Sequence, residues 1–297
     1  MAILSSNGKL LTIGGVTVNA KVGELPDIPA YTVRCLFRTG ITPEPKAWKQ
    51  FTSVQVSSNP NIWDITYEDP NWLILLYGQT DLLAVLGANT ADVTNMDNLF
   101  AYCSVLVSVS QFDTSKVTSM QSMFYNCEAL TAVPLFNTSK VTKMDNMFVN
   151  CYALQSLPLF DTSSCIDMFN IFYGCMSLTS IPLFDTSNVT NMGAMFNKCI
   201  SLTSVPLFDT SSCTDMNSMF SDCSSLMTVP LLNTSKVTKM NNMFAFCSNV
   251  QSGALALYQQ ASTQTNPPTS HEYTFYNCGS DTVTGAAELA QIPDDWK

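Results

Sequence analysis

The chain has 297 residues, enough for two ordinary domains or for one elongated repeat array with end pieces. Apolar residues make up 46%, which is typical of a globular protein, whereas charged residues make up only 12%, about half of the usual share. The net charge of -10 argues against a phosphate-backbone partner, because such partners are held by clustered lysine and arginine. We therefore expect no nucleic-acid binding.

Residues 1–30 differ in pattern from the rest of the chain. Gly14 and Gly15 separate two runs of alternating apolar residues, which is typical of a two-residue β-hairpin, and the stretch GELPDIPA then indicates an extended linker. A segment this short cannot form a hydrophobic core alone. We therefore expect it to attach the protein to a partner chain or to dock on the N-terminal cap. It lacks the features of a secretion signal, and the longest apolar run, residues 72–77, is too short to cross a bilayer. We expect no membrane anchor.

Residues 31–88 do not share the 24-residue period that begins at residue 89. They carry Trp63, Trp72 and leucine-rich segments that could cover the end of a repeat array. We predict a β-rich N-terminal capping region here.

Residues 89–252 repeat with a period of 24 and define seven coils. Each coil has a cysteine in the same place, preceded three residues earlier by a phenylalanine. The cysteines are Cys103, Cys127, Cys151, Cys175, Cys199, Cys223 and Cys247, and the phenylalanines are Phe100, Phe124, Phe148, Phe172, Phe196, Phe220 and Phe244. A single coil cannot bury enough apolar surface to fold alone, so we expect the coils to stack into a capped solenoid.

Within a coil the apolar spacing changes halfway. Met192, Met195, Phe196 and Cys199 follow the i, i+3, i+4, i+7 pattern of a short helix, and the next run, SLTSVPLF, predicts a short strand. Between strand and helix, D/N-T-S sequences such as Asp185 to Ser187 predict a turn in which short polar side chains accept backbone N–H bonds. The residues expected to point inward are Val189, Met192, Met195, Phe196, Cys199, Leu202, Val205 and Leu207.

After residue 252 the repeat fades. ALALYQQA predicts a helix, and the run from Thr274 to Cys278 repeats the phenylalanine and cysteine of a coil after an insertion. We interpret residues 253–297 as a C-terminal cap that contains a degenerate repeat. The predicted fold is thus an α/β leucine-rich-repeat solenoid of 24-residue coils, strand plus short helix, with an N-terminal β-rich cap and attachment region and a C-terminal cap.

Two sets of repeat residues are defined by this register. The predicted structural core comprises Phe124, Cys127, Leu130, Phe148, Cys151, Leu154, Phe196, Cys199, Leu202, Phe220, Cys223 and Leu226. An exposed row on the predicted sheet is the candidate binding surface, and it comprises Thr131, Gln155, Thr179, Thr203 and Met227. The loop of residues 266–273 is a rival contact surface. Because the row is small and uniform, a structural role for it stays open beside recognition.

The coil consensus M-F-x-x-C-x-S-L-T-S-V-P-L-F-D-T-S-x-V-T-x-M resembles the BspA-like leucine-rich repeats, which are known from surface proteins of bacteria, mycoplasmas and gut protists. The resemblance covers residues 89–252 and implies a solenoid with a surface-binding role. The short N-terminal β segment and the repeat domain rich in Ser, Thr and Asn also resemble virion appendage proteins of tailed phages of gut bacteria. Two hypotheses stay open: a virion surface protein and a bacterial cell-surface adhesin or secreted protein.

The chemistry-bearing residues favour structural roles. One thiol every 24 residues, with Cys165 and Cys213 replacing a valine, indicates buried reduced cysteines rather than a metal cluster or disulfides. The column Asp113, Asn137, Asp161, Asp185, Asp209 and Asn233 accepts Asp and Asn alike, which favours turn capping over calcium binding. His271, the single histidine, is expected to be a solvated loop residue.

The sequence therefore predicts a protein without a catalytic site, metal or cofactor. We expect a fibre, decoration or tail component that contacts other virion proteins through its N-terminal region. It would present the solenoid to a host protein or glycan, and homo-oligomers are expected.

Overall fold

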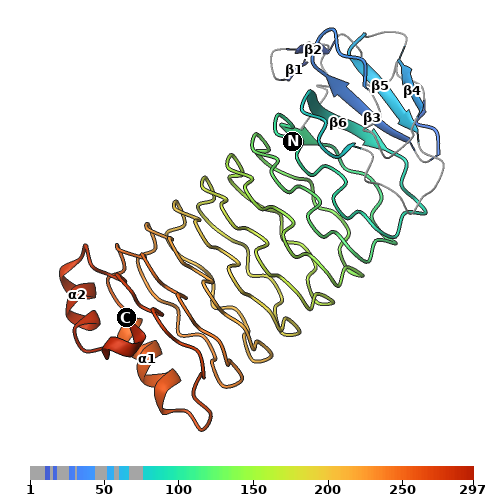
Figure 1. The fold of residues 1–297 in the computed structure, drawn as a ribbon. Coiled ribbons are helices and arrows are strands. Elements are labelled where there is room, and N and C mark those ends of the chain that lie inside the picture. Colours follow the sequence, from blue (N-terminus) through green and yellow to red (C-terminus); the bar gives the residue numbers. More distant parts are fainter. Residues whose placement is uncertain are drawn as a thin grey trace.

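The computed structural model describes residues 11–13, 16–18, 27–30, 32–43, 52–56, 60–66 and 76–297. The chain forms an elongated solenoid with a β-sheet at its N-terminal end and helices at its C-terminal end (Figure 1). The prediction of a repeat solenoid is confirmed. In the described part of the chain, no helix is long and apolar enough to cross a membrane.

A hairpin lies near the N-terminus, where the pattern around Gly14 and Gly15 predicts one. Strand β1 (Leu11–Ile13) pairs antiparallel with β2 (Val16–Val18), so that Leu11 lies opposite Val18. The two glycines themselves, like Trp72, lie outside the described residues.

A five-stranded sheet with the order β4-β5-β3-β6-β7 covers the first coil. Its strands are β3 (Thr32–Phe37), β4 (Thr52–Gln55), β5 (Ile62–Thr66), β6 (Leu82–Ala88) and β7 (Ser108–Val109). All of β3 is buried, including Arg34, whose guanidinium makes two 2.7 Å hydrogen bonds to the Asp64 carboxylate on β5. Trp63, partly buried, packs against the main core as expected of a capping residue.

The sheet continues directly into the coils. β6 pairs antiparallel with β3 on one side and parallel with β7, which belongs to the first coil, on the other. One hydrophobic core extends from Val33 in the sheet to Trp296 near the C-terminus. The N-terminal sheet and the coils therefore share one core.

The short helix predicted in each coil is wrong. Residues 193–198 form consecutive turns, and the N–H groups of Met195, Asn197 and Cys199 donate to carbonyls three residues earlier in the chain. Two residues in each turn region have positive φ, for example Ser122 at 54° and Asn126 at 57°, and an α-helix cannot contain such residues. The same spacing of apolar residues is therefore compatible with consecutive turns as well as with a helix.

The remaining N–H groups of this region bond to the next coil. In the second coil, the N–H groups of Met120, Ser122, Phe124 and Asn126 donate to carbonyls of the third coil at 2.7–3.0 Å. Parallel β-bridges 24 residues apart accompany them, from Asn95 with Ser119 to Asp215 with Lys239. We call residues 117–127 and their counterparts in the other coils the turn half of the coil. It holds the stack together.

The core consists of columns of identical side chains. Phe100, Phe124, Phe148, Phe172, Phe196, Phe220, Phe244 and Phe275 stack with ring centroids 5.0–6.0 Å apart. The threonines of the D/N-T-S turns form a buried column. Thr186 Oγ1, for example, donates to the Asp209 carbonyl at 2.7 Å. Hydrogen bonds of this threonine column therefore reach the neighbouring coil.

The C-terminal region closes the last coil. The predicted helix forms as α1 (Ala254–Thr263), and α2 (Val283–Leu289) and a 3-10 helix, η3 (Asp294–Trp296), come after it. Between α1 and α2, Phe275 continues the phenylalanine stack and Ser270 bridges to Lys239. The chain thus returns to the coil path once more before it ends.

Candidate functional site

The second half of each coil, which we call the Pro-Leu half (residues 130–137 and their counterparts), carries the candidate site. The predicted strand forms only in the first coil, as β7, because the second to sixth coils have a proline there that has no N–H to donate. In the described residues 155–160, backbone bonding to the preceding coil is limited to Gln155, whose N–H donates to the Thr131 carbonyl at 3.2 Å. The segment is thus loosely held.

Inward residues of the Pro-Leu half are spaced by three. Leu202 and Phe208 are buried and Val205 is partly buried, whereas Leu207, predicted to point inward, is 66% exposed. The Phe208 counterpart Phe160 has an N–H that donates to the Pro158 carbonyl two residues earlier, and the same bond recurs in other coils. Such a three-residue γ-turn directs its central leucine outward. The assumption of strand-like alternation was therefore the cause of the error.

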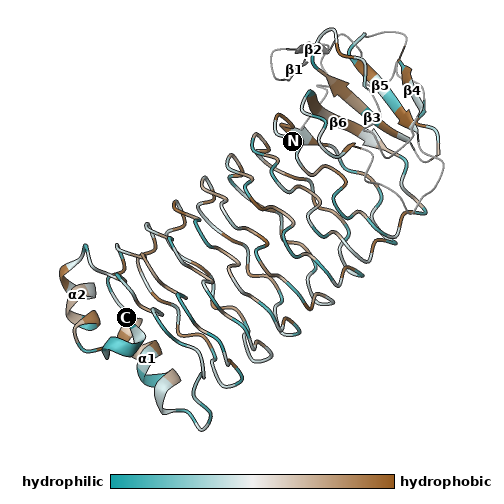
Figure 2. Ribbon diagram, viewed as in Figure 1, coloured by the Kyte–Doolittle hydropathy of each residue, from teal (hydrophilic) through white to brown (hydrophobic). Residues whose placement is uncertain are grey.

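The outward leucines form one apolar row along the solenoid. They are 53–66% exposed and occur in five consecutive coils: Leu135, Leu159, Leu183, Leu207 and Leu231. Apolar and polar stretches recur in the same order from coil to coil (Figure 2). At about 4.8 Å per coil the row is roughly 19 Å long. An ordered apolar row of this kind is a candidate contact surface, whereas isolated exposed leucines are common on protein surfaces.

The predicted exposed row lies four residues earlier in each coil. Thr131, Gln155, Thr179, Thr203 and Met227 are all exposed. They lie in the same Pro-Leu half as the leucine row, which was not predicted from the sequence. The twelve predicted core residues, from Phe124 to Leu226, are all buried.

The column of Asp and Asn borders the leucine row on the other side and caps turns, as predicted. The Ser187 backbone N–H and hydroxyl donate to Asp185 Oδ1 at 3.0 and 2.7 Å. Hydrogen bonds from Ser187 and Ser211 lower the pKa of the Asp185 and Asp209 carboxyls, so both are ionised at neutral pH. The helix start that these turns were also expected to cap does not exist.

The repeat cysteines are buried thiols, as interpreted from their spacing. From Cys127 to Cys247, each repeat thiol donates to the carbonyl of the phenylalanine in the preceding coil, with sulfur-to-oxygen distances of 3.0–3.2 Å. Burial raises the pKa of the Cys165 and Cys213 thiols to about 12, and it raises the pKa of repeat thiols such as Cys127 and Cys199 well above the usual value. Such thiols are poor nucleophiles.

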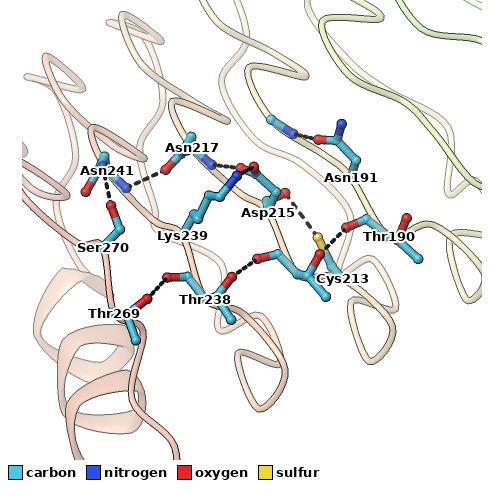
Figure 3. Close-up of polar contacts among 12 residues, drawn as sticks. Thr190, Asn191, Cys213, Asp215, Asn217, Thr238, Lys239, Asn241, Thr269 and Ser270 are labelled. Atoms are coloured by element: carbon cyan, nitrogen blue, oxygen red, sulfur yellow. Dashed lines mark hydrogen bonds and ion pairs between the residues drawn. The ribbon is translucent and has the colours of Figure 1, made fainter.

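Polar side chains on the surface of the turn half bond to one another between coils. Near the C-terminal end, Lys239 Nζ lies 2.9 Å from Asp215 Oδ2, and Asn217 Oδ1 accepts the Asn241 N–H at 2.9 Å (Figure 3). Thr238 Oγ1 donates to the carbonyl of the threonine at the same position in the preceding coil. Exposed apolar residues of the turn half, such as Ile166 and Phe169, do not recur at the same position in consecutive coils, whereas the outward leucines of the Pro-Leu half do.

The C-terminal region corrects the interpretation of His271. Its ring is partly buried and stacks on Trp296, with 4.2 Å between ring centroids, so it is not a solvated loop residue. Among the described residues, no group of three or more His, Cys, Asp and Glu side chains is placed to hold a metal ion.

The comparisons with known proteins give a family. The model of a family described as "Mycoplasma protein of unknown function, DUF285" matches residues 79–181 and 153–258, which together span more than half of the chain. The chain therefore belongs to this family. None of the curated proteins matches the sequence.

Two solved structures of leucine-rich repeat proteins are similar to this chain. The protein from Eubacterium ventriosum ATCC 27560 is 22% identical over 53% of this chain, with a TM-score of 0.42, and this chain spans 42% of its length. The T. pallidum leucine-rich repeat protein is 20% identical over 48% of this chain and 78% of its own, with a TM-score of 0.32.

Proposed function

We propose that this chain is a non-enzymatic surface protein that binds other macromolecules through the leucine-lined Pro-Leu half of its coils. The observation that carries the proposal is the row of five leucines, each more than half exposed, held in register by the buried columns beneath them. Folding does not require them to be leucine, because their side chains contribute little to the core. Their recurrence in five coils is explained by contact with a partner.

The proposed setting is the surface of a virion. In it, the N-terminal region would hold other virion proteins, and the solenoid would project as a fibre, decoration or tail component toward a host protein or glycan. The elongated shape supports this arrangement, because the N-terminal sheet lies at one end of the solenoid and leaves the faces of the coils free (Figure 1).

A cell-surface adhesin is the second candidate, and the family match favours it, since that family is described from Mycoplasma. Antibody against the solenoid, applied to intact particles and intact cells of the source, separates the two settings. Gold label on unbroken particles supports the virion setting, and label on unbroken cells supports the adhesin. Label only after cells are broken open would contradict both.

The contact role is tested with the purified chain. We expect labelled protein to bind intact host cells or particles, and the variant Leu159→Asn/Leu183→Asn/Leu207→Asn to lose most of that binding. A matched control, Ile166→Asn/Met176→Asn/Ile200→Asn, changes three exposed apolar residues outside the row and should bind like the wild type. Equal binding by both variants would contradict the role of the leucine row.

A further inference from the structure

The leucine row is periodic, and its period restricts what can fit against it. We propose that two copies of this chain pair face to face through the leucine row, with their solenoid axes parallel and their N-terminal sheets at the same end. This inference rests on the proposed contact role of the row and names the partner that fits it.

Spacing is the first argument for a second copy. The leucines succeed one another at the separation of stacked coils, about 4.8 Å. A partner whose side chains have another spacing could meet only some of them. A second solenoid of the same chain presents the same spacing along its whole length. In such a pair every leucine from Leu135 to Leu231 finds an apolar neighbour.

Charge selects the orientation of the pair. Two facing rows can be related by a twofold axis perpendicular to the row, which makes the solenoids antiparallel, or along it, which makes them parallel. The antiparallel pair would place Asp185 opposite its own copy and Asp161 opposite Asp209 of the second copy, because each of these residues lies two positions after an outward leucine. Facing carboxylates repel one another.

The parallel pair avoids this repulsion. It turns the aspartate column of one copy toward the hydroxyl-rich column of the other, which contains Thr179 and Thr203. Hydroxyl groups can donate hydrogen bonds to carboxylates. It also brings both N-terminal sheets to the same end, so that both copies can attach to one surface, as the proposed function requires.

The available area is compatible with a pair of moderate affinity. Five coils at about 4.8 Å and six residue steps at about 3.3 Å give a face of roughly 24 by 20 Å, hence about 500 Å² on each copy. The total of about 1,000 Å² is at the lower limit for a specific protein interface. We therefore expect the pair to dissociate in the micromolar range.

Sedimentation equilibrium of the full chain tests the pairing. Between about 1 and 100 µM the wild type should approach twice the 32.5 kDa of one chain. The variant Leu159→Asn/Leu183→Asn/Leu207→Asn should stay at one chain with an unchanged circular dichroism spectrum, and the control Ile166→Asn/Met176→Asn/Ile200→Asn should pair like the wild type. A wild type that stays monomeric at 100 µM, or a leucine variant that still pairs, overturns the proposal.

Cross-linking tests the orientation. The native cysteines are buried, so the single variant Leu135→Cys adds the one accessible thiol in the described part of the chain. Mild oxidation should yield a covalent dimer of Leu135→Cys. Cross-links only when Leu135→Cys is mixed with Leu231→Cys would show an antiparallel pair and overturn the parallel one. A wild type that stays monomeric at 100 µM but binds cells or particles overturns the pairing and leaves the proposed function standing. A wild type that pairs through the row but binds neither cells nor particles supports the pairing and contradicts the proposed function.

Discussion

The two halves of each coil differ in what holds them. In the turn half, four N–H groups per coil bond to the next coil, thiols bond across coils, and stacked phenylalanines fill the space between them. In the Pro-Leu half, the proline has no backbone N–H to donate. The leucine that follows it points outward from the γ-turn. The comparison indicates that inter-coil backbone hydrogen bonds are concentrated in the turn half, whereas the Pro-Leu half is held mainly by its buried side chains and carries the contact surface that we propose.

The largest expected effect is alkaline unfolding through the turn half. Because the folded pKa of the buried thiols is raised, their contribution to stability is complete below the unfolded pKa of about 9 and is lost as the pH rises toward 12. Each thiol costs about 1.4 kcal/mol per pH unit in that window, so several together exceed a typical total stability of roughly 5–15 kcal/mol.

Circular dichroism should therefore show cooperative unfolding roughly between pH 9 and 11. Ellman's reagent should detect few thiols in the native protein at pH 8 and all eleven in urea. Rapid reaction of several native thiols would contradict the burial of this half.

Removing one ring from the phenylalanine stack should have the next largest effect. Phe196 lies between Phe172 and Phe220, with centroids 5.7 and 5.4 Å away, and Phe196→Ala should lower the free energy of unfolding by about 3–5 kcal/mol. Leu207→Ala in the Pro-Leu half should change it by less than about 0.5 kcal/mol, measured by urea denaturation of dilute protein. Similar losses for the two variants would remove the distinction between the halves.

The positive-φ positions offer a third comparison. Asn126 has φ of 57° and accepts a 2.8 Å hydrogen bond from Asn150, so Asn126→Val should cost about 2–3 kcal/mol through backbone strain and the lost bond. Asn126→Gly relieves the backbone and should cost much less. Thermal denaturation of both variants separates strain from loss of the side chain, and equal losses would show that the backbone conformation does not matter.

A buried threonine gives the smallest effect. Thr186→Val removes the bond to the Asp209 carbonyl and should cost about 1 kcal/mol. The same change at exposed Thr190, which donates to the Ile166 carbonyl at 3.2 Å, should be close to neutral. If the two variants unfold at the same urea concentration, burial does not determine how much these inter-coil bonds contribute to stability.

The sequence predicted the period, the core columns and the capped turns because identical residues recur at each of these positions. The helix was wrong because apolar residues at i, i+3, i+4 and i+7 fit both a helix and the observed turns. A further signal was present, since residues that tolerate positive φ recur in the turn half, as at Asn98, Asn126, Asn146, Asn150 and Gly174. Sequence periodicity alone does not distinguish the two backbones.

The leucine row was missed for a related reason. Leu202, Val205 and Phe208 are spaced by three, and a strand alternates by two, so the position of Leu207 was assigned to the wrong side. A proline before each outward leucine indicated a break in alternation. The γ-turns themselves depend on backbone contacts that no single residue type specifies.

Hydrogen–deuterium exchange read by mass spectrometry tests the central claim most directly, because it reports both halves of a coil in one experiment. In dilute protein, amides of residues 144–150 should exchange slowly and those of residues 155–160 quickly, and raising the concentration should slow exchange only in the second group. The division of each coil into two functionally different halves would be contradicted if both groups of amides exchanged at the same rate. It would also be contradicted if a higher protein concentration slowed amide exchange in the turn half.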